Sequence, residues 1–482
     1  MSMLASYPSA SASLELIWAA LPFGIGLASA ALVTAKKAAG WSLNNLIPTA
    51  SLRPGDSTHD TEFKEDQDAF LTRCETEYGS MFNVNLHGKH ITVISGSEIQ
   101  EVFMNDSFSP TDAFEEMTGI QTFFNSARKS NHNDDLHIIH RVISQIITPK
   151  LALFTVRIQE HLETTLDKRL GAYARRDNRI IVEEPWPIFK EMSAHAVAAV
   201  FMGPESAQSP EVIDTFMASI DDFAKMFESS TRSVSLLRKT LFRATHRILS
   251  PLQVHVQSLV QATTPIILER RRREMDAAER GVEWERPDDV MQSMLDNFDT
   301  YNFVDLEDVC GHLLILVLTS LHSTSDVATK MMYFLAAFPD CIGILYREHQ
   351  EALDIVQQER EQMRQELIQR GLPIGEQLYP SRDRDVSAAA LKKMVRLDSF
   401  IREMFRFRSE KLNMYHRARN DVALSNGVVI AKGRTVVINM RSAHQGPDQG
   451  PEVTKFRPWR FVGKSKAATK VAADFLPFGM GK

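Results

Sequence analysis

Apolar residues recur at spacings of three and four along most of this 482-residue chain. Such spacing puts the apolar side chains on one face of a helix, which then packs against a core. The segments with this pattern are 61–78, 136–175, 186–201, 211–227, 233–249, 251–279, 306–338, 348–370 and 391–408. Segment 306–338 is apolar for most of its length but interrupted by polar residues, which predicts a buried helix through a domain centre.

Two segments alternate between apolar and polar residues instead. Residues 82–95 turn at His87-Gly88-Lys89, and residues 422–439 turn at Asn426-Gly427 and Lys432-Gly433. Alternation around such turn residues predicts a β-hairpin at 82–95 and a small β element at 422–439. The sequence therefore predicts a mainly α protein with a small β element.

Residues 108–135 are polar and rich in turn-forming residues, and they are predicted to be a long loop. The loop contains Phe114, Phe123 and Phe124. Long loops in compact proteins are often functional. These three aromatic side chains are therefore expected to face an apolar ligand in a pocket.

The N-terminal region contains an apolar segment long enough to cross a lipid bilayer as a helix. Residues 14–33 are mostly apolar, Lys36 and Lys37 follow them, and no Lys or Arg precedes them. A helix of about 20 such residues spans a membrane, and basic residues remain on the cytosolic side. The predicted order is a tail at 1–13, a transmembrane anchor at 14–33, a linker at 34–60 and one large domain at 61–482. A cleaved signal peptide is the alternative, because Ala28-Ser29-Ala30 resembles a cleavage site.

Charge and cysteine content exclude several classes of protein. The formal net charge is −6, so nothing predicts a nucleic-acid partner. The three cysteines, Cys74, Cys310 and Cys341, form no C-x-x-C pair, so neither a disulfide framework nor a zinc site is predicted. Hydrophobic residues make up 44% of the chain, which is ample for a large core.

Three motifs follow one another in the C-terminal third. Glu403 and Arg406 stand three residues apart in a predicted helix, so their charges can pair. Next comes Phe456-Arg457-Pro458-Trp459-Arg460-Phe461, with a second arginine among aromatic residues. The last is Phe475-Leu476-Pro477-Phe478-Gly479-Met480-Gly481-Lys482. Alone, an E-x-x-R pair is more often a surface ion pair.

In this order the motifs resemble those of the cytochrome P450 family, the haem-thiolate monooxygenases, over about residues 60–482. Glu403, Arg406 and Arg460 match the buried charge trio of the family, and the resemblance implies a structural role for them beneath the haem. Buried charges persist only if each is paired. Phe478 and Gly481 match the start of the F-x-x-G-x-[RH]-x-C-x-G loop, which carries the haem ligand.

The central predicted helix resembles the distal helix of the family. His322 occupies the position of an acid, Ser323 that of an alcohol, and Thr324 follows. The resemblance implies that these residues relay protons to bound oxygen, and an imidazole can serve as a shuttle. The bland alternative is that the hydroxyls bond back to helix carbonyls. The histidine resembles fungal members that oxidise terpenoids and related hydrophobic metabolites.

Basic residues elsewhere resemble the groups that hold haem propionates. His137 and Arg141 lie one turn apart on a predicted helix, and arginine forms forked bonds to carboxylates. Arg417, just before the second β segment, resembles another propionate contact, and Arg419 is the alternative.

The family pattern places the ligating cysteine three positions past Lys482, and none of the three cysteines matches it. The thiolate ligand favours O–O cleavage, so stable iron–thiolate ligation is not expected in these 482 residues, and no metal ligand is assigned. The expectation is a C-terminally truncated, inactive or fragmentary member. A true premature stop and an incomplete gene model both remain open.

The resemblance implies haem b, a lipophilic small-molecule substrate, and electrons from NADPH-cytochrome P450 reductase. The intact enzyme is expected to insert one oxygen atom of O₂, with its catalytic domain on the cytosolic side of the endoplasmic reticulum membrane. One rival is a membrane-attached, non-catalytic protein that binds a metabolite or partner. The other is an unrelated all-α protein whose motifs match by chance. Substrate, regiochemistry and oligomeric state are not readable from the sequence.

Overall fold

The computed structural model describes residues 47–125, 127, 129, 135–173, 175–176, 179–232, 251–373, 386–446 and 449–480. The predicted anchor at 14–33, the predicted helix at 233–249 and Gly481 lie outside these ranges. The chain forms two compact units, which we describe one at a time. The sheet unit comprises the described parts of Met1–Ala113, Ser409–Asp448 and Ala472–Lys482. The helical unit comprises those of Phe114–Arg408 and Gln449–Val471.

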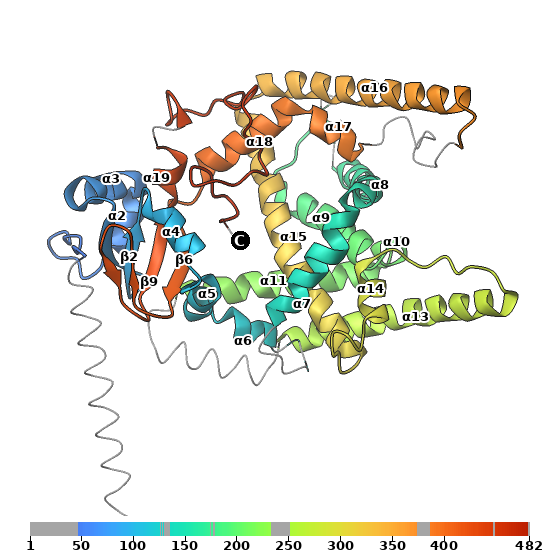
Figure 1. Cartoon of the computed structure of the whole chain (residues 1–482), viewed down its shortest axis with the longest axis horizontal. Coiled ribbons are helices and arrows are strands. Elements are labelled where there is room, and N and C mark those ends of the chain that lie inside the picture. The colour runs from blue at the N-terminus through green and yellow to red at the C-terminus, as the bar shows by residue number, and fades with distance from the viewer. Residues whose placement is uncertain are drawn as a thin grey trace, which may run out of the picture. The chain divides into compact units, whose positions relative to one another are not determined.

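The sheet unit is built on five strands in the order β1-β2-β9-β6-β3 (Figure 1). Only β2 and β9 pair in parallel; the other neighbours are antiparallel. The strands are β1 (Met81–Leu86), β2 (Lys89–Ile94), β3 (Phe108–Ser109), β6 (Leu412–Ala418) and β9 (Thr435–Asn439). A separate pair joins β7 (Val422–Ala423) to β8 (Val429–Ile430).

The predicted hairpin at 82–95 is confirmed. His87 and Gly88 both have positive φ, at 54° and 69°, as a two-residue turn between twisted strands requires. Strand β6 was not predicted, because a bulge between Asn413 and His416 interrupts its alternation.

Short helices complete the sheet unit. The segment predicted as one helix at 61–78 is two helices, because Asp66 is extended and its side chain accepts the Ala69 N–H at 2.9 Å. The helices are α2 (Asp60–Glu65), α3 (Gln67–Tyr78), α4 (Glu98–Met104) and α19 (Met440–His444). A further helix, α5 (Pro110–Thr118), begins in this unit and ends in the helical unit.

The helical unit is mainly α, as predicted. Its α-helices are α6 (Ile120–Asn125), α7 (Asp135–Val142), α8 (Leu151–Gly171), α9 (Trp186–Phe201), α10 (Pro204–Ala207), α11 (Pro210–Arg232), α13 (Pro251–Arg280), α14 (Val290–Asp296), α15 (Leu306–Ala337), α16 (Asp340–Gln369), α17 (Ala388–Lys393) and α18 (Val395–Arg408). Between α7 and α8 lie a π-helix, η1 (Ile143–Ile147), and a 3₁₀ helix, η2 (Thr148–Lys150). One strand pair joins β4 (Arg175–Arg176) to β5 (Arg179–Ile180).

The prediction of a long loop at 108–135 is wrong for its described part, which forms β3, α5 and α6. Ser109 Oγ accepts the Asp112 N–H at 3.0 Å, and Pro110 is the first residue of α5. A serine cap followed by proline is a strong helix start. The polar residues that suggested a loop therefore begin a helix instead.

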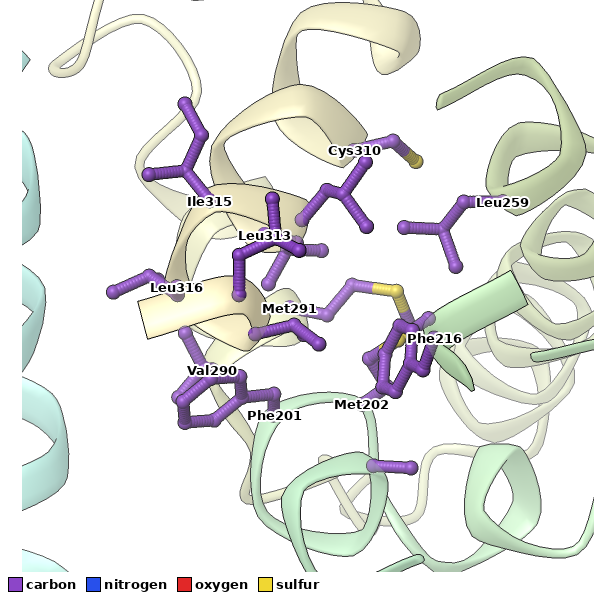
Figure 2. Close-up of a cluster of buried hydrophobic side chains, with 14 of the residues drawn as sticks. Phe201, Met202, Phe216, Leu259, Val290, Met291, Cys310, Leu313, Ile315 and Leu316 are labelled. Atoms are coloured by element: carbon purple, nitrogen blue, oxygen red, sulfur yellow. The ribbon is translucent and has the colours of Figure 1, made fainter. Parts of the chain in front are cut away.

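Helix α15 runs through the helical unit with α9 and α11 beside it (Figure 1). Its first half is buried almost completely. It packs in a cluster with side chains of α9, α11, α13 and α14, including Phe201, Phe216, Leu259 and Met291 (Figure 2). Among described helices, α15 is the one long and apolar enough to span a membrane, but 67% of its apolar window is buried inside the protein. It is therefore the core helix that the sequence predicted.

Candidate functional site

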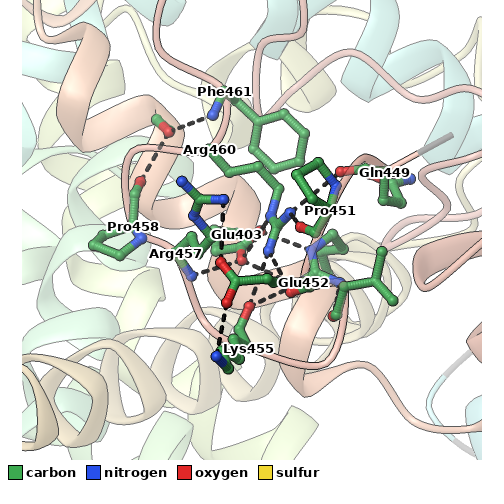
Figure 3. A network of polar contacts seen from close by, with 12 residues as sticks. Glu403, Gln449, Pro451, Glu452, Lys455, Arg457, Pro458, Arg460 and Phe461 are labelled. Atoms are coloured by element: carbon green, nitrogen blue, oxygen red, sulfur yellow. Dashed lines mark hydrogen bonds and ion pairs between the residues drawn. The ribbon is translucent and has the colours of Figure 1, made fainter. Parts of the chain in front are cut away.

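Helix α18 presents Glu403 and Arg406 on one face, inside the helical unit. Arg406 Nε lies 2.7 Å from Glu403 Oε2, and Arg406 Nη2 lies 2.9 Å from Oε1. Arg460 Nε lies 3.0 Å from each of the same two oxygens. Glu403 and Arg406 are fully buried and Arg460 is 8% exposed. The structure thus brings together the three charges that the motifs singled out. Figure 3 shows Glu403 and Arg460 of this cluster.

The remaining donors of the two arginines bind main-chain carbonyls of one segment, residues 449–457. Arg406 donates to Val453 at 2.8 Å. Arg460 donates to Pro451 at 2.8 Å and to Glu452 at 3.0 Å, among others. Because every charged group is both paired and hydrogen-bonded, the cluster can be buried. It fixes a segment without regular secondary structure against α18.

Sequence reasoning missed three further α18 residues that hold the next segment, residues 458–470. Ser399 donates to the Pro458 carbonyl at 2.8 Å. Arg402 donates to the Ala467 carbonyl at 2.6 Å, and Asp398 accepts the Ala468 N–H at 3.0 Å. The peptide group between Ala467 and Ala468 therefore has both of its polar groups bound: its carbonyl by the positive Arg402 and its N–H by the negative Asp398. Their spacing of four residues on α18 was the available signal.

Residues 475–480, the described part of the ligand loop, belong to the sheet unit. Phe475 and Leu476 are fully buried, whereas the Phe478 side chain is 65% exposed. Gly479 has φ of +73° and donates its N–H to the Leu476 carbonyl at 3.1 Å. The segment therefore forms a turn with Phe478 at its tip.

Among the hydroxyl groups of α15 at residues 323–325, two are exposed and one is buried. Ser323 and Thr324 are exposed, and both donate back along the helix: Ser323 to Thr319 at 3.0 Å and Thr324 to Ser320 at 2.7 Å. Ser325 is buried and donates to Leu321. The back-bonding foreseen as the bland alternative is therefore present, and the exposed oxygen atoms can still accept a hydrogen bond.

His322 points away from the exposed hydroxyl groups, toward aromatic rings of α9 and α11. Its ring lies 5.5 Å from Trp186 and 6.5 Å from Phe223, with edge-on geometry in both pairs. Its buried Nδ1 has no hydrogen-bond partner within the described chain. Burial lowers the pKa of His322 below its usual 6.5, and the nearby Asp326 carboxylate opposes that shift. The imidazole is therefore neutral at neutral pH.

The candidate propionate contacts are divided between the units. Within the helical unit, His137 and Arg141 lie on α7; the His137 side chain is outside the described set, and the Arg141 guanidinium lies 5.2 Å from the centre of the Tyr301 ring. Within the sheet unit, Arg417 lies on β6.

The alternative residue, Arg419, is already engaged. Its guanidinium forms a two-bond ion pair with Asp112, with both distances at 2.8 Å. This pairing lowers the pKa of Asp112.

Two of the three phenylalanines predicted to face a ligand have described side chains. Phe114 is 40% exposed, and the Phe124 ring stacks on Phe223, with 6.3 Å between centres and 4° between planes. The side chain of Phe123 lies outside the described set. Because Phe223 also contacts His322, the aromatic ring of Phe124 and the imidazole share one neighbour.

All three cysteines are buried. Burial raises the pKa of both Cys74 and Cys310 to about 12, and it raises the pKa of Cys341. Thiolate is the form that binds metals, so these side chains are poor ligands. No group of three His, Cys, Asp or Glu side chains among the described residues could hold a metal ion.

Comparisons with known proteins agree with this arrangement. The chain is 25% identical to cytochrome P450 monooxygenase AtmP of Aspergillus flavus over 72% of its length, and spans 62% of AtmP. It is 22% identical to the ent-kaurene oxidase of Gibberella intermedia, over 84% of this chain and 70% of that one. The structure of retinoic-acid-bound cyanobacterial CYP120A1 matches with a TM-score of 0.55 and 19% identity, covering 90% and 86% of the two chains.

The central α15, the small mixed sheet and the buried Glu403 cluster define a mainly α class of fold found in haem proteins. The family model described as Cytochrome P450 matches residues 58–368 and 376–482. The chain belongs to the cytochrome P450 family, and the family implies a haem cofactor.

Proposed function

We propose that this protein is a haem-dependent monooxygenase that oxidises a lipophilic small molecule with O₂ and electrons from a reductase. The observation that carries the proposal is the buried cluster of Glu403, Arg406 and Arg460 in a chain of this family. The cluster holds residues 449–457 in place. It therefore supports the part of the chain that leads to the ligand loop.

The residues present fit haem in their chemistry. Arg141 and Arg417 are cations suited to propionate carboxylates, and His137 is the third candidate. Phe478, the ring at the tip of the candidate ligand loop, is 65% exposed. When bound, haem supplies the iron at which oxygen is activated for transfer to the substrate.

The protein's own part in proton delivery falls to His322, Ser323 and Thr324. A neutral imidazole can take a proton on one nitrogen and release one from the other. The buried Nδ1 of His322 is open to such an exchange. Ser323 and Thr324 each keep an oxygen lone pair available while their protons are held by helix carbonyls.

A terpenoid or a similarly hydrophobic metabolite is the substrate class we propose. One relative is named an ent-kaurene oxidase, and another, 20% identical over 86% of this chain, is named a lanosterol 14-alpha demethylase of Eremothecium gossypii. The aromatic residues Phe114 and Phe124 suit a ligand of this kind.

Residues 14–33 are proposed to anchor the protein in the endoplasmic reticulum membrane, with the two units on the cytosolic side. The apolar length of the segment and the lysines that follow it support this arrangement. NADPH-cytochrome P450 reductase is the proposed electron donor, by analogy with the family.

The carbon monoxide spectrum of the reduced protein tests the proposal. Two polypeptides are compared: residues 1–482, and the same residues followed by an in-frame His/Arg-x-Cys-x-Gly continuation read from the transcript. Because Cys74, Cys310 and Cys341 are buried, we expect a thiolate-type band from the extended polypeptide and none from residues 1–482.

Two outcomes would contradict this view. A thiolate-type band from residues 1–482 would show that one of the three cysteines is a ligand. If the transcript lacks such a continuation and a lipophilic compound raises the melting temperature of haem-free protein, the non-catalytic binding protein is favoured instead.

A further inference from the structure

The last residue of α19, His444, contacts the start of the ligand loop within the sheet unit. Its Nε2 accepts the Leu476 main-chain N–H at a distance of 2.8 Å. The imidazole and the Phe475 ring lie 5.6 Å apart with 31° between their planes. All three residues are fully buried. A buried peptide N–H requires an acceptor, and here a side chain from another element provides it.

Leu476 is the residue from which the turn of the loop begins. Its side chain is part of the sheet-unit core, and its carbonyl accepts the Gly479 N–H at 3.1 Å. A β-carbon at Gly479 would lie 3.4 Å from Phe103 and 3.5 Å from the Met414 sulfur, so the turn packs against these two side chains. The placement of Phe478 and Gly479 therefore depends on the placement of Leu476.

Helix α19, which carries His444, is held in place by hydrogen bonds of Asn439 and Arg441. The Asn439 side chain caps the helix by accepting the Ser442 N–H at 3.3 Å, and it donates to Glu75 at 2.8 Å. Arg441 binds the other oxygen of the same carboxylate at 2.8 Å. The imidazole is therefore held from both ends: by the helix that carries it and by the loop that it contacts.

We propose that His444 is a positioning residue for the haem-ligand loop, acting through the hydrogen bond from Leu476 N–H to its unprotonated Nε2. An imidazole nitrogen accepts a hydrogen bond only when it carries no proton. The bond fixes the register of residues 475–480 from outside the loop. This inference rests on the proposed function, because a haem must bind for the loop to position its ligand.

Three variants of the full 482-residue chain separate the hydrogen bond from the packing. His444→Phe keeps a ring against Phe475 and removes the acceptor. His444→Gln loses the ring but offers a carbonyl oxygen as acceptor. His59→Phe is the matched control, because His59 is also buried in the sheet unit and its Nδ1 accepts the Asn85 N–H at 2.9 Å.

Amide hydrogen exchange measured by mass spectrometry on haem-free protein reads the loop directly. We expect His444→Phe to speed exchange at Leu476 and Gly479 by roughly tenfold, the loss of about one net hydrogen bond. His444→Gln should recover most of the protection. His59→Phe should speed exchange at Asn85 and leave Leu476 unchanged. Unchanged exchange at Leu476 in His444→Phe, or an equal change in His59→Phe, would overturn the proposal.

The rate at which haem-loaded protein loses haem to apomyoglobin tests the consequence for the cofactor. It is measured on the same variants of the polypeptide extended by the His/Arg-x-Cys-x-Gly continuation, because residues 1–482 alone are not expected to bind the iron through a thiolate. We expect His444→Phe to lose haem several-fold faster than the wild type and His59→Phe, with His444→Gln between them. Equal rates despite a deprotected Leu476 amide would overturn the positioning role. If the extended wild type takes up no haem, the proposed function fails and the haem part of the inference with it, while hydrogen exchange on the 482-residue chain still decides whether His444 anchors the loop.

Discussion

At the scale of single residues, buried charge is the main feature of this protein. Glu403, Arg406 and Arg460 are removed from water, yet each has a charged partner and main-chain partners. Removing one partner leaves the others buried without compensation, which destabilises far more than loss of a surface pair. This difference can be measured within one chain.

Arg406→Ala is expected to lower the free energy of unfolding by about 3–5 kcal/mol, because it leaves the Glu403 carboxylate short of a partner. Arg272→Ala is the control. Arg272 pairs with Glu269 and Asp276 on the surface of α13, where such a pair contributes about 1 kcal/mol or less. Denaturant unfolding of both variants gives the comparison. Similar small losses would show that the buried cluster does not stabilise the fold.

His322 is expected to make stability depend on pH. Burial lowers its pKa in the folded protein, so the unfolded chain takes up a proton at a higher pH than the folded one. The wild type should therefore lose stability as pH falls below the usual value of 6.5 toward the folded pKa. His322→Phe keeps an aromatic ring beside Trp186 and Phe223 and should reduce this loss.

Asp326→Asn is the matched variant for this measurement. The Asp326 carboxylate raises the pKa of His322, so its removal should lower that pKa further and steepen the loss of stability in acid. Melting temperatures across the range from about pH 7 to 5 test both variants, since that range brackets an ordinary histidine. Parallel curves for wild type and His322→Phe would show that the imidazole titrates normally.

At the scale of elements, α18 acts as a template for the irregular chain that follows it. Its side chains bind main-chain groups between residues 453 and 470 at several points. Main-chain hydrogen bonds within that segment form turns and not a helix or a strand, so the contacts with α18 contribute to its shape. The same helix therefore carries two residues of the charge cluster and binds the segment that precedes the ligand loop in the sequence.

Arg402→Met is expected to loosen this segment. It removes the Arg402 donors to the Ala467 and Lys470 carbonyls, and hydrogen bonds to charged groups contribute about 1.5–3 kcal/mol each. Hydrogen exchange should rise at Ala468, whose N–H is bound by Asp398 on the same peptide unit. Lys393→Met, which removes an exposed pair with Glu359, is the control. Equal exchange at Ala468 in both variants would contradict the role of Arg402.

The element predictions were wrong where a local sequence pattern is compatible with two different secondary structures. Residues 108–118 combine serine, proline and acidic residues, which suit both a loop and a capped helix start. The helix forms here because the Ser109 hydroxyl accepts the Asp112 N–H and so caps the first turn. Similarly, the helical pattern of 391–408 continued across Met394, where the chain breaks between α17 and α18. Hydrogen bonds of single residues set these boundaries.

At the scale of the whole molecule, residues 14–33 are expected to determine where the protein is found in the cell. The full chain should remain with membranes after washes with high salt and alkaline carbonate, because about 20 apolar residues span a bilayer. A chain that starts at residue 47 should be released, at least in part. Retention of both chains to the same extent would show that another surface binds the membrane.

The sequence alone determined the family, the helix-rich composition and the pairing of Glu403 with Arg406, because these depend on spacings of a few residues. Tertiary structure decided which distant groups meet. Arg460 joins Glu403 across 57 residues, and His444 reaches Leu476 across 32. Periodicity reports only which face of an element is apolar, whereas burial and the need of each buried polar group for a partner select these long-range pairs.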